Sequence, residues 1–242
     1  MEDIIKYAII ADIHANKYAL ESFLNFIEEE IPVDKILNMG DFVHIGPHPK
    51  EVLEVILKDK RFLNVLGNND LIVLGQRKEE WPPGIEQHRG WTLDQIGSPL
   101  LDELRKVPDS MTFKTKGKMI LMLHSHLYSL PNRSIRDNIL LYQGKSLKEF
   151  VDDYPDAADI ILLGHTHEKM YLVTKNKIFI NPGSLSLTNK SSISFCLMEF
   201  DSDDINVTFK SIPYDSSQLK NDYEYRNVAE REFLLKYFYP FI

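Results

Sequence analysis

Cysteine is almost absent from this chain, because Cys196 is the only one among 242 residues. A single thiol excludes an internal disulfide framework and is typical of a reducing compartment, so we expect a cytoplasmic protein. Cys196 lies in the apolar run ISFCLMEF with no basic neighbour that could stabilise a thiolate. The sequence therefore argues against a cysteine phosphatase and predicts a structural role for this residue.

Long apolar runs and an excess of positive charge are also missing. No run approaches the roughly 20 residues that span a bilayer, and the start of the chain lacks the features of a signal peptide. The 28 lysines and arginines are outnumbered by 36 aspartates and glutamates, which gives a net charge of −8. We therefore expect no membrane partner and no extended nucleic-acid surface. A small anionic substrate stays open, because metal ions can reverse the local charge.

The hydrophobic content of 43% and the length suit an ordinary globular protein with a substantial core. We expect one domain over residues 1–242. Within it, residues 75–108 combine a proline-containing loop with two short helical patterns. This stretch is either a small helical cap or insertion, or a set of helices packed on the sheet.

Short apolar runs that stop at polar residues dominate the first two thirds of the chain. The runs YAIIADIHAN, KILNMGD, FLNVLGNND, MILMLHSH and IILLGHTH end at Asp12 and His14, at Asp41, at Asn68, at His124, and at His165 and His167. Runs of this length, bounded by turn residues, favour buried strands. Helical spacing over residues 16–30, with Asn16 as N-cap, and over 48–59 separates the first three strands. The pattern predicts an α/β fold.

The last third has a different pattern. Residues 169–181 and 192–214 each read as a β-hairpin, and no helix separates the two. We therefore expect a second, more antiparallel sheet in this region. Residues 223–242 predict a final helix whose aromatic tail packs back on the domain.

The polar residues at the strand ends suit one shared site. Ligands bind beyond the carboxyl ends of strands in α/β sheets, so separate clusters can meet there. Aspartate, histidine and asparagine together favour Mn, Fe, Zn, Ni or Co. Seven candidate ligands exceed the need of one ion, and paired ions about 3.5–4 Å apart are suited to displacement at phosphorus. A serine-hydrolase G-x-S-x-G elbow is absent, and His14 stands where an aspartyl-phosphate mechanism would favour a second aspartate.

The motifs DIH at 12–14, GD at 40–41, GNND at 67–70, HS at 124–125, GHTH at 164–167 and NPGS at 181–184 occur in this order. The ordered set resembles the calcineurin-like metallophosphoesterase superfamily, and its small prokaryotic phosphodiesterase-like members in particular. The resemblance implies a four-layer α/β/β/α sandwich of two mixed sheets with a dinuclear centre. It also implies hydrolysis of phosphomonoester or phosphodiester bonds by a hydroxide that bridges two divalent transition-metal ions.

The resemblance further implies which side chains hold each ion. One ion would be bound by Asp12, His14, Asp41 and His167. The other would be bound by Asp41, Asn68, His124 and His165, so that Asp41 bridges the pair and is central to catalysis.

One departure from the family affects catalysis. Many active relatives carry histidine directly after the metal-binding asparagine, whereas this chain has Asn69, a candidate catalytic residue that hydrogen-bonds but does not titrate. His126 is our first candidate for a substitute proton donor. His44, Arg133 and Arg136 are candidate substrate contacts, with solvent-facing positions as their alternative.

The missing histidine also leaves a second functional class open. The alternative is a non-catalytic metal-binding scaffold for protein interaction, because a retromer subunit with a similar fold uses such a site for protein contacts. The leading hypothesis is an enzyme acting on a small phosphorylated substrate, with a homo-oligomer as a further option.

Overall fold

The structure is a computed structural model. It describes the 242-residue chain except residues 1–3, 78–84, 126–150, 153, 189 and 202–203. Of the expected site residues, His126, Arg133 and Arg136 lie outside the described residues.

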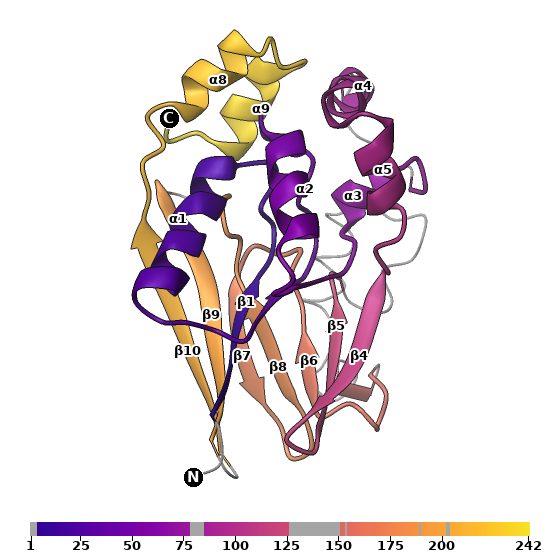
Figure 1. The fold of residues 1–242 in the computed structure, drawn as a ribbon, viewed down its shortest axis with the longest axis vertical. Coiled ribbons are helices and arrows are strands. Elements are labelled where there is room, and N and C mark those ends of the chain that lie inside the picture. Colours follow the sequence, from indigo (N-terminus) through magenta and orange to yellow (C-terminus); the bar gives the residue numbers. More distant parts are fainter. Residues whose placement is uncertain (1–3, 78–84, 126–150, 153, 189, 202–203) are drawn as a thin grey trace.

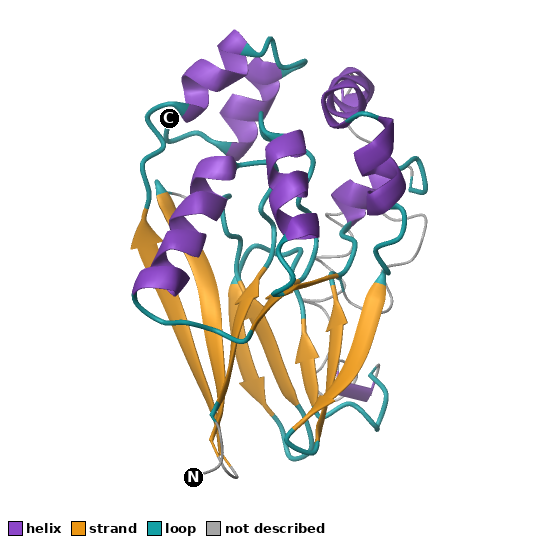
Figure 2. Ribbon diagram, in the orientation of Figure 1, coloured by secondary structure: helices purple, strands orange, loops and turns teal. Residues whose placement is uncertain are grey.

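Two five-stranded mixed sheets form the centre of the protein (Figures 1 and 2). The first sheet has the order β10-β9-β1-β2-β3, in which β1, β2 and β3 are parallel and β9 and β10 are antiparallel to their neighbours. Its strands are β1 (Ile5–Ile10), β2 (Lys35–Asn38), β3 (Phe62–Asn64), β9 (Ser192–Asp201) and β10 (Asp204–Pro213).

The second sheet has the order β4-β5-β6-β8-β7. Strands β5, β6 and β8 are parallel, while β4 and β7 are antiparallel edge strands. Its strands are β4 (Ser110–Thr115), β5 (Lys118–Leu123), β6 (Ile160–Leu162), β7 (Lys169–Val173) and β8 (Ile178–Pro182).

Both predicted hairpins are present, but the expectation that they share one antiparallel sheet is wrong. The β7–β8 hairpin belongs to the second sheet, and the β9–β10 hairpin pairs with β1 in the first. The reason is that β9 is apolar on both faces: Phe195 packs towards the helices, while Cys196 and Met198 pack between the sheets. A strand with two buried faces requires a central position.

The layers follow from three hydrophobic clusters. Residues of both sheets, such as Ile9, Met122 and Met198, form the core between them. The other face of the first sheet is covered by α1 (Lys17–Glu29) and α2 (Pro49–Lys58). The outer face of the second sheet packs against Val151, Tyr154 and Ala158. This order of helices and sheets is the expected sandwich.

The N-terminus of α1 is capped as the sequence predicts, because the Asn16 side chain accepts a hydrogen bond from the Ala19 amide at 3.2 Å. The short helix α3 (Asn68–Val73) follows β3. The two helical patterns within residues 75–108 become α4 (Ile85–Ile96) and α5 (Ser98–Leu104), and both contact α2. Ile96 of α4 and Leu101 and Leu104 of α5 belong to the same hydrophobic core cluster as residues of α1 and α2.

The chain ends in two helices where the sequence pattern predicts one. They are α8 (Leu219–Tyr225) and α9 (Arg231–Phe238), and between them Asn227 and Glu230 adopt positive φ angles of 48° and 59°. Left-handed residues interrupt a right-handed helix. Tyr239 is fully buried in a cluster with Ile45, so the tail packs within the molecule, as expected.

Candidate metal centre

The candidate ligands lie at the carboxyl ends of five strands, six of them in loops and Asn68 at the first position of α3. Asp12 and His14 follow β1, Asp41 follows β2, Asn68 follows β3, His124 follows β5, and His165 and His167 follow β6. Figure 2 shows these strand ends directed towards the helices of the molecule. The structure brings all seven side chains together, as the contacts below show.

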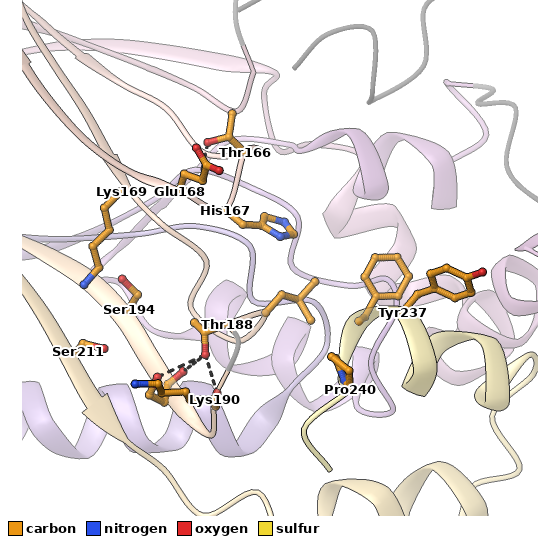
Figure 3. Close-up of a pocket in the computed structure, with 13 residues that line it drawn as sticks. Thr166, His167, Glu168, Lys169, Thr188, Lys190, Ser194, Ser211, Tyr237 and Pro240 are labelled. Atoms are coloured by element: carbon orange, nitrogen blue, oxygen red, sulfur yellow. Dashed lines mark hydrogen bonds between the residues drawn. The ribbon is translucent and has the colours of Figure 1, made fainter. Parts of the chain in front are cut away.

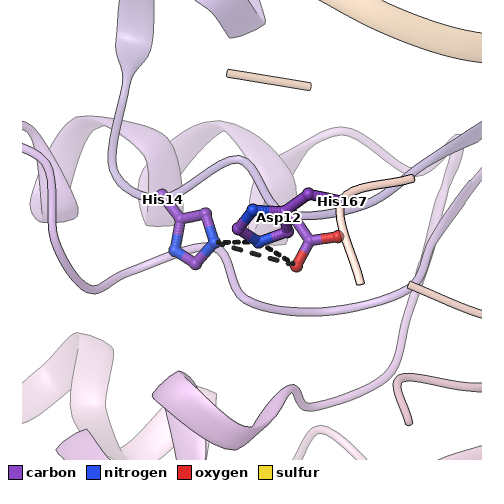
Figure 4. Close-up of side chains that lie close together, drawn as sticks. All are labelled: Asp12, His14 and His167. Carbon is purple, nitrogen blue, oxygen red and sulfur yellow. Dashed lines mark hydrogen bonds and ion pairs between the residues drawn. The ribbon is translucent and has the colours of Figure 1, made fainter. Parts of the chain in front are cut away.

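A first donor group consists of Asp12, His14 and His167, whose side chains point at one another (Figure 4). The two Nε2 atoms are 3.2 Å apart. Oδ1 of Asp12 is 3.4 Å from Nε2 of His167 and 3.7 Å from Nε2 of His14. Metal–nitrogen bonds of about 2.1 Å in tetrahedral geometry place neighbouring donors about 3.4 Å apart. The spacing therefore fits one ion.

A second donor group lies around Asn68. Its side-chain Oδ1 is 3.0 Å from Nε2 of His124 and 2.8 Å from Nδ1 of His165. Oδ2 of Asp41 lies 3.3 Å from the same His124 nitrogen. These four residues are the set that the family resemblance implies for the second ion.

The two donor groups adjoin at the two carboxylates. Asp41 Oδ2 is 3.9 Å from His14 Nε2, and Asp12 Oδ1 is 3.9 Å from His124 Nε2. Asp41 thus lies near histidines of both groups, as a bridging ligand must. Asp12 does so as well, which the sequence motifs did not indicate.

The donors fit a cation on chemical grounds. Asp12 Oδ1 is buried and accepts no hydrogen bond. The lone pairs of the carboxylate oxygens and imidazole nitrogens repel one another unless a proton or a cation lies between them. A buried carboxylate oxygen without a hydrogen-bond partner also destabilises the folded protein. Nitrogen and oxygen donors without thiolate match borderline divalent metals.

Burial sets the protonation of the histidines. It lowers the pKa of His14 to about 4 and that of His165 to about 3, in the latter case helped by the His124 charge. Both imidazoles are therefore neutral at pH 7, which is the form that binds metals. For His124, burial is outweighed by Asp41 and Asp12, which raise its pKa to about 9. Burial would raise the pKa of Asp41, yet His124 and His14 hold it below its ordinary value. The buried carboxylates of Asp12 and Asp41 are therefore stabilised by positive charge placed between them and the histidines.

Five of the seven candidate ligands adopt left-handed backbone angles. They are Asp12, His14, Asp41, His165 and His167, with φ between 47° and 72°. Residues with a Cβ rarely adopt this region, and strain of this kind gathers at functional sites. The positive φ angles of His165 and His167 also explain how residues two apart reach the same centre. A turn replaces the strand there.

Two motif glycines are required because backbones approach closely at the site. A Cβ on Gly67 would lie 2.1 Å from Asp41 Oδ1, and a Cβ on Gly40 would lie 2.5 Å from the Gly67 nitrogen. No real Cβ makes such contacts, so the GD and GNND motifs pack against each other only with glycine at both positions.

Asp70 supports the centre in a way that the sequence pattern did not predict. Its buried carboxylate accepts hydrogen bonds from the backbone amides of Gly67 at 2.9 Å, Asp41 at 2.8 Å, Phe42 at 3.0 Å and Val43 at 3.2 Å. Burial and the nearby Asp41 charge raise its pKa to about 7. Asp70 therefore fixes the loop that carries Asp41, and its place in the GNND motif was the available signal.

The NPGS motif supports the centre in a similar way. Asn181 donates to the Gly164 carbonyl at 2.7 Å, beside the two histidines of GHTH. The Ser184 hydroxyl donates to the backbone carbonyl of Asp12 at 2.9 Å. The motif thus ties the β6 loop and the β1 loop to the strand end of β8.

The surroundings of Asn69 and His44 correct one expectation. Asn69 donates from its backbone amide and its side chain to Asp41, and its Oδ1 lies 3.0 Å from Nδ1 of His44. His44 is fully buried, so it has no surface with which to contact a substrate. Because its hydrogen bond fixes the orientation of the Asn69 amide, we assign it a positioning role. His48 is also buried and pairs with Asp222 at 2.8 Å, away from solvent.

The chain belongs to the calcineurin-like phosphoesterase superfamily, whose domain profile matches residues 5–203. It is 29% identical over 238 residues to an uncharacterised protein of Methanocaldococcus jannaschii, covering 90% of each chain. Its fold is similar to a metallophosphoesterase from Sphaerobacter thermophilus, with a TM-score of 0.69, 22% identity and coverage of 97% of this chain and 98% of that one. A hypothetical protein of Pyrococcus horikoshii gives a TM-score of 0.74, 19% identity and the same coverage.

Proposed function

We propose that this protein is a dinuclear metal-dependent phosphoesterase that hydrolyses phosphomonoester or phosphodiester bonds. The observation that carries the proposal is the meeting of two donor groups around Asp12 and Asp41, with histidine nitrogens 3.3–3.9 Å from these carboxylates. Membership of a phosphoesterase superfamily supports the same reaction class.

Each donor group would hold one divalent ion. Asp12, His14, Asp41 and His167 would bind the first, and Asp41, Asn68, His124 and His165 the second. When bound, such a pair supplies an ionised water at neutral pH and offsets the negative charge of the phosphate. Mn, Fe, Zn, Ni and Co all suit these donors.

The other residues of the centre act by positioning. Asp70 holds the backbone that presents Asp41, and Asn69 orients the Asp41 carboxylate. Because the Asn69 amide is occupied by Asp41 and His44, it is not a source of the leaving-group proton. His126 remains our candidate for that proton, and Arg133 and Arg136 for phosphate contacts; all three lie outside the described residues.

The test is to load the purified protein with Mn²⁺ or Ni²⁺ and assay it on p-nitrophenyl phosphate and bis-p-nitrophenyl phosphate. Asp41→Asn keeps the size of the side chain but removes its charge. We expect metal-dependent hydrolysis by the natural protein and a loss of at least about 100-fold in kcat for the variant, since the neutral amide removes one ligating oxygen and the negative charge that both ions would share. The preferred ester distinguishes a phosphatase from a phosphodiesterase.

Elemental analysis of the same samples separates the enzyme from the scaffold alternative. A protein that binds two equivalents of metal but hydrolyses neither ester at any pH from 6 to 9 would refute the enzyme proposal. It would favour the metal-binding scaffold instead. A protein that binds no divalent metal would refute both.

The proposal also covers the domain organisation, the substrate class, the cellular location and the oligomeric state. We propose a single domain over residues 1–242, a small phosphorylated substrate, a cytoplasmic location and the option of a homo-oligomer. In the described part of the chain, no helix is both long enough and apolar enough to cross a membrane.

A further inference from the structure

A pocket of about 690 Å³ lies against the metal centre (Figure 3). Its volume is within the range of small-molecule sites, about 300–1,000 Å³. It is lined by the loop after β6, the start of β7, the β8–β9 connection and the C-terminal tail. Its lining includes His167, Lys169, Leu187, Lys190, Phe238 and Pro240.

The pocket adjoins the one candidate ligand that is open to solvent. The side chain of His167 is 31% exposed, whereas those of Asp12, His14, Asp41 and His124 are at most 3% exposed. Among the described residues, access to the first donor group therefore runs past His167. A substrate whose phosphate reached this group would leave the rest of its structure in the pocket.

Two lysines give the pocket its charge. Lys169 and Lys190 are both exposed, and neither ammonium group forms an ion pair or hydrogen bond with a described residue. Most arginines of the described chain, such as Arg61 and Arg226, are paired with carboxylates. Glu168 is the only acidic residue that the described lining contributes. Two uncommitted cations in a chain of net charge −8 favour an anionic ligand.

Apolar residues form a further part of the lining, which includes Leu187 and the tail residues Phe238 and Pro240. In Figure 3, Pro240 lies across the pocket from Lys169. The tail that carries Phe238 and Pro240 is held by the fully buried Tyr239. This wall is therefore a fixed surface that can contact the carbon skeleton of a ligand.

We propose that this pocket binds the alcohol portion of the phosphate ester, and that this portion carries a second anionic group, a phosphate or a carboxylate. The scissile phosphate would lie at the metal centre, the second anion would contact Lys169 and Lys190, and the organic skeleton would lie along the tail. The inference rests on the proposed function, because it assumes that a phosphate reaches the ions.

The test compares two phosphonates, whose carbon–phosphorus bond resists hydrolysis, by isothermal titration calorimetry on the Mn²⁺-loaded protein. Para-carboxybenzylphosphonate carries the second anion, and para-methylbenzylphosphonate has a similar shape without it. We expect the first to bind roughly fivefold more tightly, as two partly solvated charge contacts imply. The variant Lys169→Met/Lys190→Met should bind both equally. Lys236→Met, which removes an exposed ammonium group on α9 outside the pocket lining, should keep the preference.

The outcomes separate this inference from the proposed function. Equal binding of the two phosphonates by the natural protein, binding of neither, or a preference that survives in the double variant would each overturn the subsite. A preference that is lost in the double variant, in a protein that hydrolyses no ester, would support the subsite and refute the enzyme proposal. Ester hydrolysis by a protein that binds both phosphonates equally would support the enzyme proposal and refute the subsite.

Discussion

The side-chain amide of Asn69 donates a hydrogen bond to Oδ2 of Asp41 at 2.6 Å, while its backbone amide donates to Oδ1 at 2.7 Å. Both oxygens of the proposed bridging carboxylate are thus held by one residue. Hydrogen bonds to ligating carboxylates fix their orientation and contribute to metal affinity. In this chain the residue after the proposed metal ligand Asn68 orients Asp41, whereas a histidine at that position could transfer a proton.

Asn69→Ala should therefore weaken metal binding. The backbone bond to Asp41 survives, but the carboxylate loses its side-chain donor, and we expect Mn²⁺ affinity to fall about tenfold. Competition with a chelating dye measures the change. Asn206→Ala, at an exposed position on β10, is the matched control and should leave the affinity unchanged. Unaltered affinity in Asn69→Ala would show that the contact is dispensable.

Replacing glycine by alanine should abolish metal binding at Gly67 but stabilise the fold at Gly90. Gly67→Ala places a Cβ 2.1 Å from Asp41 Oδ1, so the Asp41 loop must move and metal binding should be lost. Gly90→Ala lies within α4, where a Cβ meets nothing within 4 Å. Alanine should raise the free energy of unfolding there by about 0.5–1 kcal/mol. Urea denaturation and metal titration of both variants check this, and a metal-binding Gly67→Ala protein would contradict the close approach.

Stability should fall in acid partly because of His48. Burial lowers its pKa to about 4 from 6.5, although the hydrogen bond with Asp222 opposes the shift. The unfolded chain therefore binds a proton below pH 6.5 that the folded chain accepts only near pH 4, so this stability is present above pH 6.5 and is lost towards pH 4. The loss is on the order of 3 kcal/mol.

Urea unfolding at pH 7 and pH 4.5, in the presence of a chelator, measures this loss. His48→Gln cannot titrate and should lose less stability than the natural protein over the same interval. Other buried histidines titrate in both proteins, so the difference between the two slopes isolates His48. Parallel slopes would mean that His48 has an ordinary pKa in the fold.

The C-terminal tail should contribute strongly to stability. Tyr239 is fully buried and packs edge-to-face on Tyr223, with ring centroids 6.0 Å apart. Tyr239→Ala should lower the free energy of unfolding by about 3–5 kcal/mol. Tyr225→Ala removes the same side chain from a position that is 88% exposed and should change it by less than about 0.5 kcal/mol. Similar values for the two variants would show that the tail is not docked in solution.

Local sequence patterns predicted much of the fold and of the candidate site. The Asn16 cap, the α1 periodicity and the two hairpins depend on neighbouring residues, so they could be predicted from the sequence. The seven candidate ligands could be predicted too, because each follows a short apolar run and strand ends gather at one edge of a sheet. The break between α8 and α9 was missed, since Glu230 carries no glycine or proline signal for its left-handed backbone.

The amino-acid sequence by itself determined most strands and helices and the candidate metal ligands, because these follow from residue type and short-range periodicity. Only the tertiary structure decided which sheet each hairpin joins, that Asp70 holds the Asp41 loop, and that His44 lies buried behind Asn69. These outcomes depend on contacts between residues that are far apart in the sequence, 18 positions for Ile160 and Ile178 and 25 for His44 and Asn69. Packing and burial select such contacts, and no local pattern encodes them.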